Sequence, residues 1–191
     1  IGIWETATGK LVRPLTAATF YSQATPVPAT AMASEYEWGG VRALAFSADG
    51  GLLIAGGMGP ADPNSAGTDG KMRIEAFDTA TGKSLAAHHP ADSKGMLMSM
   101  FLHDGGPWVI AAGGGGQNGV GFGGICLWDP KLVDKDKKPV APIHYKSPLV
   151  IREIVPNSDG QSLLTVGTLK EIHAGRIEVW DGTAPALPSK K

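Results

Sequence analysis

Residues 113–124, GGGGQNGVGFGG, have the spacing with which glycine-rich loops hold phosphate groups. The pattern G-x-G-x-x-G occurs twice, once from Gly114 and again from Gly119. A dinucleotide-binding loop needs a strand before it and a helix after it, because the N-terminus of the helix binds the pyrophosphate. Here the tract lies between two β-prone runs, WVIAA and ICLWD, and no G-K-[ST] motif is present. We therefore interpret it as a loop between two strands and predict no nucleotide site there.

The segment around residues 62–69 carries several oxygen ligands of the kind that calcium prefers. Asp62, Asn64 and Asp69 are the candidate ligands. An EF-hand loop does not fit, because its twelfth position needs a bidentate glutamate and is Arg73 here. An irregular calcium site built from the three oxygen-bearing residues stays open as an alternative. The main prediction is that the chain holds no metal and no cofactor.

Acid–base chemistry is the next candidate, because Glu171 and His173 alternate along one segment. The two could exchange a proton, but neither a nucleophile nor a third partner can be identified for them. We interpret them as part of a recognition loop. His88 and His89 are neighbours at the end of a β-prone run. Neighbouring strand residues point to opposite faces, so this pair is not expected to bind one metal together.

Two further groups are expected to serve packing. Met96, Met98 and Met100 alternate along a β-prone run, which predicts that they share one core-facing side. Cys126 is the only cysteine, so the chain has no internal disulfide and no cysteine metal cluster. It lies in an apolar run and is expected to be a structural thiol.

The elements that would position these residues recur along the chain. Four segments share one pattern, an isoleucine followed three residues later by an aromatic residue and then an acid: IGIWE, IEAFD, ICLWD and IEVWD. The aromatic residues are Trp4, Phe77, Trp128 and Trp180, and the acids are Glu5, Asp78, Asp129 and Asp181. Alternating apolar positions followed by an acid and turn residues predict a strand that enters a hairpin.

A second element precedes three of these segments. It consists of a β-prone run, an Asp-Gly pair and a second apolar run, with the pairs at Asp49, Asp104 and Asp159. Asp-Gly in this position favours a tight hairpin, because glycine accepts positive φ without strain. The predicted unit is therefore two hairpins, or four antiparallel strands. Trp128 follows Phe77 by 51 positions and Trp180 follows Trp128 by 52, so the unit repeats at a nearly constant period.

This pattern resembles the WD40-repeat β-propeller family, and its glycine-rich blades look similar to bacterial members. The residues that carry the resemblance are Trp128–Asp129, Trp180–Asp181, the near matches Phe77–Asp78 and Trp4–Glu5, and FSADG from Phe46. The resemblance implies blades of four antiparallel strands. Two departures are visible. The Gly-His pair before the first strand is absent, and the second strands end in Ala-Gly-Gly or Val-Gly where the family often has Ser or Thr. The family's Asp–His–Ser/Thr–Trp network is therefore not expected here.

The predicted fold is all-β, a partial WD40-like propeller of about three to four blades. The expected division is the end of one blade (1–16), an insertion (17–40), two blades (41–90 and 96–146), an incomplete blade (149–182) and a tail (183–191). Closed propellers contain roughly 4 to 8 blades. We therefore expect the chain to belong to a larger propeller, whose remaining blades are among its partners.

Charge and loop lengths bear on function. The net charge is −1, from 17 Lys and Arg against 18 Asp and Glu, and no basic stripe suggests nucleic acid. No apolar run approaches the roughly 18 residues that a membrane helix needs. Loops on a rigid scaffold commonly carry recognition, so the lengthened loops predict a non-catalytic protein-interaction scaffold. The candidate partner-binding residues are Asp62, Asn64, Asp69, Gln117, Asn118, Glu171 and His173.

Two other functions stay open. The chain could be an accessory propeller of a larger bacterial enzyme or redox protein. It could also be a propeller enzyme with a metal in its central channel. The second alternative requires acids or histidines at the starts of the first strands, where the chain has Arg42, Arg152 and Glu153. The composition does not distinguish a cytoplasmic from an exported protein.

Overall fold

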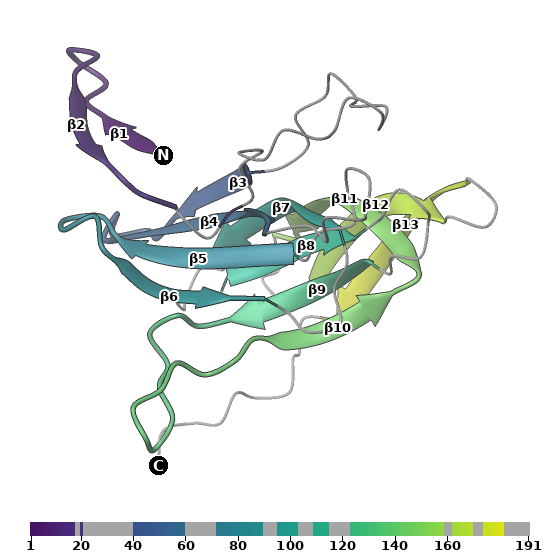
Figure 1. The fold of residues 1–191 in the computed structure, drawn as a ribbon. Helices are drawn as coiled ribbons and strands as arrows, with labels where there is room; N and C mark the ends of the chain where they lie inside the picture. Colours follow the sequence, from purple (N-terminus) through teal and green to yellow (C-terminus); the bar gives the residue numbers. More distant parts are fainter. Residues whose placement is uncertain are drawn as a thin grey trace, which may run out of the picture.

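The computed structural model describes residues 1–17, 20, 40–59, 72–89, 95–102, 109–114, 123–158, 162–169 and 174–181. This part of the chain forms thirteen β-strands (Figure 1). None of its residues forms a helix, so it contains no helix that could cross a membrane. The all-β fold predicted from the sequence is confirmed.

The strands form four antiparallel sheets, and in each sheet neighbouring strands follow one another in the chain. The first sheet contains β1 (Gly2–Trp4) and β2 (Leu11–Pro14). The second contains β3 (Gly40–Phe46), β4 (Leu52–Met58), β5 (Met72–Asp78) and β6 (Ser84–His88). The third contains β7 (Met96–Leu102), β8 (Val109–Gly114), β9 (Gly123–Trp128) and β10 (Ile143–Ser147). The fourth contains β11 (Leu149–Pro156), β12 (Ser162–Leu169) and β13 (Ala174–Asp181). Four-stranded antiparallel meanders like the second and third sheets are the unit from which β-propellers are built.

The hairpin between β3 and β4 shows how an Asp-Gly pair makes the turn. Gly50 has φ 69°, the left-handed conformation that glycine adopts without strain. Asp49 Oδ1 accepts hydrogen bonds from Ser47 Oγ at 2.5 Å and from the amide of Gly51 at 3.0 Å. These two bonds lower the pKa of the Asp49 carboxyl below its usual value. The matching residues Asp104 and Asp159 lie outside the described residues.

In each of the last three sheets, the first strand (β3, β7 or β11) contains a β-bulge at the equivalent position. The bulges lie between Val41 and Ala43, between Leu97 and Ser99, and between Ile151 and Glu153. A bulge inserts one unpaired residue and so shifts the alternation of side chains after it. Leu97 and Met100 consequently pack into the same core cluster, although three positions of regular strand would place them on opposite faces. The bulge therefore interrupts the alternation from which a single face was predicted for Met96, Met98 and Met100, and the side chain of Met96 lies outside the described part of the structure.

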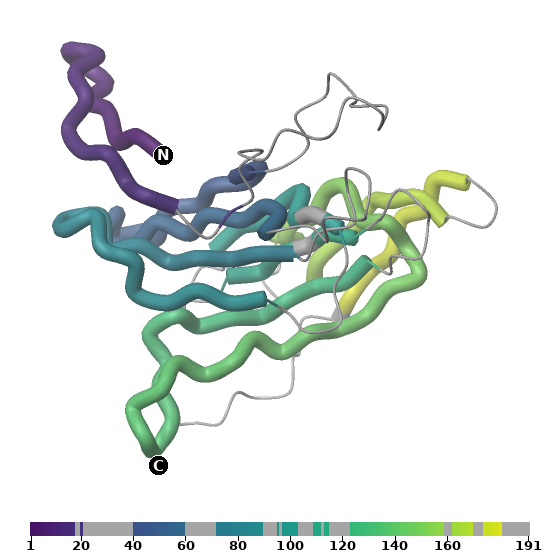
Figure 2. The backbone as a smooth tube through the Cα atoms, in the orientation of Figure 1, coloured from purple at the N-terminus to yellow at the C-terminus, as the bar shows by residue number. Residues whose placement is uncertain are grey.

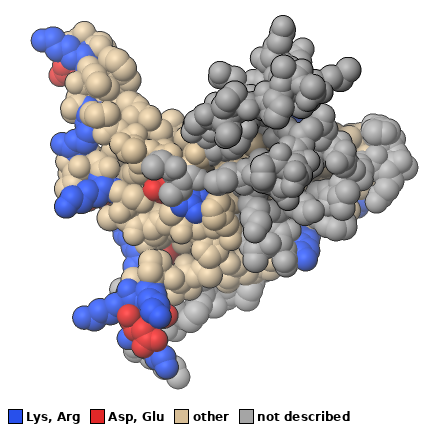
Figure 3. Space-filling view, in the orientation of Figure 1, with Lys and Arg blue, Asp and Glu red and all other residues tan. Residues whose placement is uncertain are grey.

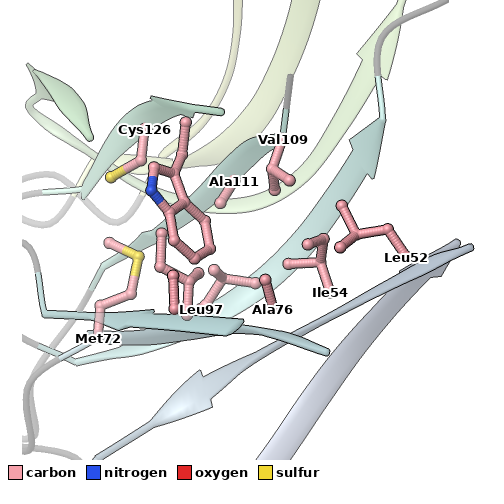
Figure 4. Close-up of a cluster of buried hydrophobic side chains, with 11 residues drawn as sticks. Leu52, Ile54, Met72, Ala76, Leu97, Val109, Ala111 and Cys126 are labelled. Carbon is pink, nitrogen blue, oxygen red and sulfur yellow. The ribbon is translucent and has the colours of Figure 1, made fainter. Parts of the chain in front are cut away.

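The sheets pack face to face along the chain, as the tube view shows (Figure 2). The first strands β3, β7 and β11 are neighbours in this stack. Three apolar clusters fill the spaces between successive sheets. The cluster between the second and third sheets joins residues of β4, β5 and β6 to residues of β7, β8 and β9 (Figure 4). Burial of these side chains is the main force that holds one sheet on the next.

The hairpin of β1 and β2 is attached to the sheet that follows it. Leu15, which exchanges two backbone hydrogen bonds with Ile1 at 3.1 and 2.8 Å, is buried in one cluster with Phe77 of the second sheet. Arg13 Nη1 donates to the carbonyl oxygen of Thr79 at 2.9 Å, in the turn between β5 and β6. Ile3 packs against the apolar cluster on the near side of the second sheet. These contacts make the hairpin the first sheet of the stack (Figure 1).

Candidate functional site

The repeated acids fold the turns between third and fourth strands. Asp78 Oδ1 accepts hydrogen bonds from the amide of Thr81 at 2.6 Å and from its hydroxyl at 2.8 Å. These bonds lower the pKa of the Asp78 carboxyl. Asp129 Oδ1 accepts from the amide of Lys131 at 2.9 Å. These two acids therefore have a local structural role, since short polar side chains commonly bond to the backbone of a turn.

The repeated aromatic residues lie on the sheet faces. Phe77 and Trp128 are buried in two different clusters, Trp180 packs on a third, and Trp4 is exposed. Trp180 Nε1 donates to Thr165 Oγ1 at 3.0 Å. The prediction that the family's hydrogen-bond network would be missing is thus wrong for one bond in the last sheet. Thr165 lies in the middle of β12, directly before the Val166-Gly167 pair where the sequence pattern has glycine in place of Ser or Thr.

The candidate partner-binding residues Asp62, Asn64, Asp69, Gln117, Asn118, Glu171 and His173 all lie outside the described residues. The strand ends that carry these loops are described. Met58 pairs with Met72, Gly113 with Gly124, and Leu169 with Ala174. In each of these three sheets, the second and third strands therefore remain paired with each other close to the point where the loop between them begins. Met58 and Met72 are also fully buried.

A groove of about 430 Å³ lies between the end of β10 and β13. Its lining residues are Lys146, Ser147, Pro148, Arg176, Ile177, Glu178, Val179 and Trp180. The first three come from the end of β10 and the link to β11, and the other five are consecutive in β13. Consecutive strand residues point to alternate faces, so a groove lined by five in a row follows the edge of the strand. Among the described strands, β13 pairs only with β12.

The charges in this groove are arranged around one carboxylate. Glu178 Oε2 accepts a hydrogen bond from Ser147 Oγ at 3.0 Å, and Glu178 Oε1 lies 3.6 Å from Arg176 Nε. Ser147 Oγ in turn accepts from the amide of Leu149 at 3.1 Å. Two cationic side chains, Lys146 and Arg176, therefore line the groove with a single acid. No sequence pattern indicated this site, because it depends on two segments about thirty residues apart lying together.

Charged side chains elsewhere gather at hairpin tips. The exposed tip at residues 134–138 combines acids and lysines and lies between β9 and β10 (Figure 3). Asp134 Oδ1 accepts hydrogen bonds from the amides of Asp136 and Lys138, at 2.8 and 2.9 Å. These bonds fix the tip without any residue of another sheet.

The residues considered for a metal-binding channel are on the inner strands. Arg42 and Arg152 are the extra residues of two equivalent bulges. Glu153 accepts a hydrogen bond from Ser99 Oγ, which links the third and fourth sheets. His89 Nδ1 lies 3.1 Å from the carbonyl oxygen of Met72. Among the described residues, no group of three or more His, Cys, Asp and Glu side chains could hold a metal ion.

Cys126 is buried in the cluster between the second and third sheets (Figure 4). Burial raises the pKa of its thiol to about 12. A thiol with so high a pKa is protonated at neutral pH and is a poor nucleophile.

Comparison with known proteins gives structures of similar fold. No protein-family model matches the chain, and no curated protein matches it. Among solved structures, U3-55K is 11% identical, with a TM-score of 0.46 over 91% of this chain and 43% of that one. A periplasmic gluconolactonase of Pseudomonas aeruginosa is 14% identical, with a TM-score of 0.49 over 93% of this chain and 44% of that one. The Dos1 propeller is 12% identical, with a TM-score of 0.40 over 74% of this chain and 45% of that one. The chain matches less than half the length of each of these structures.

The gluconolactonase corrects one prediction. The sequence predicted that this chain is a non-catalytic scaffold, and left open whether a longer parent protein is an enzyme. An enzyme is nevertheless among the structures similar to it. A propeller-like fold therefore does not exclude catalysis, and the exclusion drawn from the sequence is wrong.

Proposed function

We propose that the chain is a protein-interaction scaffold of WD40-type blades, which binds a partner protein through the loops between second and third strands. The support is the way these loops are attached. The strands beneath them remain paired up to Met58, Gly113 and Leu169, close to the loop ends. Because these strands are already ordered, binding at the loops costs little conformational entropy in the rest of the protein.

The groove beside β13 supplies the second part of the binding surface. It lies between the end of β10 and β13, and the edge of β13 borders it. An extended peptide can add a strand to such an edge, with its main chain giving affinity and its alternate side chains giving specificity. Lys146 and Arg176 favour a peptide that carries acidic residues. The proposed partner therefore presents an extended acidic segment.

The test of the loops is partner recovery with shortened variants. Residues 60–71 and 115–122 are each replaced by a short glycine–serine turn, and the tagged chain is used to capture proteins from its native lysate. A matched control carries glycine and serine at residues 135–137, in the charged tip between β9 and β10. We expect the same partner with the wild type and the control, and a loss of at least tenfold with the loop variants. Equal recovery from all of them would contradict the role of the loops.

The groove is tested separately by reversing its charge. Arg176→Glu and Lys146→Glu place negative charge where the acidic segment would lie, and Lys135→Glu is the matched change at a distant tip. Titration of the captured partner should show weaker binding to the two groove variants and unchanged binding to the tip variant. If the groove variants bind as well as the tip variant, the partner does not use β13.

A further inference from the structure

The side chain of His89 lies at the base of the loop between β4 and β5. Its Nδ1 atom is 3.1 Å from the carbonyl oxygen of Met72, the first residue of β5. A carbonyl oxygen only accepts hydrogen bonds, so Nδ1 must carry the proton and donate it. The imidazole also lies against Gly59, the residue that follows β4, because a Cβ atom there would be 2.4 Å from Cε1 of His89. One side chain therefore contacts both ends of the loop.

The pairing of β5 with β6 explains why a side chain is needed at Met72. The last paired residues of these two strands are Ile74 and His88. Continued by two residues, the same register would place Met72 opposite Pro90, which has no N–H with which to extend the ladder. The imidazole N–H of His89 supplies a donor to the carbonyl group of Met72 in place of the backbone.

The third sheet solves the same problem with its backbone. Its β9 and β10 remain paired beyond Ile125, which is the equivalent of Ile74 in the repeat, as far as Gly123 and Ser147. The start of β9 is therefore attached to its outer neighbour by the ladder itself. The second sheet lacks that last pair and has the contact of His89 there instead.

The contact of His89 lies among buried groups. Met58, Gly59 and Met72, at the two ends of the loop, are all buried. Burial lowers the pKa of the neighbouring His88, and the charge of His89 lowers it further. A buried carbonyl group that loses its donor is costly, so the bond to Met72 favours this one orientation of the His89 ring.

We propose that His89 is a positioning residue for the loop at residues 60–71, because it holds the two ends of that loop together. The inference rests on the proposed function, in which this loop binds the partner. A loop whose ends are already fixed loses less conformational freedom on binding, so the contact should raise the affinity for the partner. Gly59 belongs to the same device, since a side chain there would displace the imidazole.

Nitrogen-15 NMR of the imidazole tests the contact without any partner. At about pH 8, above the ordinary histidine pKa of about 6.5, the shifts of His89 should show the proton on Nδ1 and none on Nε2. Gly59→Ala should displace the ring and move the proton to Nε2, at least in part. Gly175→Ala is the matched control, because a Cβ atom there meets no atom within 4 Å. A wild type with the proton on Nε2 would overturn the proposal.

Amide hydrogen exchange tests whether the contact holds the loop ends. His89→Ala should speed exchange at the amides of Met58 and Met72 by about tenfold, because local opening no longer breaks the bond to His89. His89→Asn keeps a donor at the position of Nδ1 and should recover part of the protection. His88→Ala removes the neighbouring imidazole instead and should leave both amides unchanged. Exchange in His89→Ala as slow as in the wild type would contradict the proposal.

Titration of the partner captured with the wild-type chain tests the use of the contact. His89→Ala should weaken binding by about fivefold, and His89→Asn should restore part of the loss. If shortening residues 60–71 abolishes binding while His89→Ala binds as the wild type does, the role of His89 is overturned and the proposed function stands. If neither change weakens binding, both are contradicted.

Discussion

Glycine near the end of a second strand lets two strands approach more closely than a side chain would allow. A Cβ atom at Gly57 would lie 2.0 Å from the carbonyl oxygen of Gly40, and one at Gly167 would lie 2.5 Å from that of Val150. Both glycines pair with the residue just before a bulge, Val41 or Ile151. Backbone atoms cannot move aside as a side chain can. The glycines found where the WD40 pattern often has Ser or Thr are thus explained by the bulges.

The first prediction concerns the close contact between β3 and β4 at Gly57. Gly57→Ala should lower the free energy of unfolding by about 1–3 kcal/mol, the usual cost of overpacking a close contact. Urea unfolding followed by circular dichroism measures the difference. Gly175→Ala is the matched control in β13, because a Cβ atom there meets no atom within 4 Å. Equal effects of the two substitutions would show that the first strand can move away from Gly57.

The hydroxyl of Thr165 is the partner of a tryptophan and is itself fully buried. Thr165→Val keeps the shape of the side chain but leaves the indole N–H of Trp180 without its acceptor. An unsatisfied buried donor costs about 1–3 kcal/mol, so the variant should unfold at a lower urea concentration. Thr165→Ser retains the hydroxyl and should recover part of the loss. A valine variant as stable as the wild type would mean that water replaces the bond.

At the scale of the element, the acids Asp78 and Asp129 each stabilise the turn that follows a third strand. The folded protein lowers the pKa of Asp78 below its ordinary value of 3.8, chiefly through the hydroxyl and amide of Thr81. A carboxyl with a lowered pKa contributes stability above its unfolded pKa, and this contribution is lost as the pH falls through the folded value. The third prediction is that Asp78→Asn is less stable than the wild type at neutral pH. The difference in urea midpoint should shrink below pH 3.8. A constant difference down to pH 2, on the order of two units below the ordinary value, would exclude the turn carboxylate as its cause.

The order of the strands was predictable from the sequence, whereas the β-bulges and the groove beside β13 were not. Asp-Gly pairs and alternating apolar runs around Asp49 and Trp128 predicted antiparallel sheets because their signals are local. The bulges at Arg42 and Arg152 were missed, since each depends on a backbone contact with a partner strand. The groove lined by Lys146 and Arg176 was missed for the same reason. Its charges come from two strands whose juxtaposition no local pattern reports.

At the scale of the whole molecule, stability comes from the contacts between successive sheets. In a stack where each sheet touches only its neighbours, stability is approximately the sum of sheet and interface terms. The cluster around Trp128 joins the two complete sheets and thus the two halves of the chain (Figure 4). Within the described residues, the first and fourth sheets each have an apolar interface on one side only. They should therefore open more often than the two sheets between them.

The fourth prediction compares the effect on stability of a substitution inside the stack, at Trp128, with that of one at its end, at Trp4. Trp128 is 2% exposed, and Trp128→Ala should lower the free energy of unfolding by about 3–5 kcal/mol. Trp4 is 59% exposed, and Trp4→Ala in dilute solution should change it by about 0.5 kcal/mol or less. Hydrogen exchange read by mass spectrometry should show Trp128→Ala speeding exchange in β5 and β9 together, because one cluster serves both. Faster exchange confined to β9 would mean that the sheets do not stabilise one another, and the stacked arrangement would then not account for the stability of the fold.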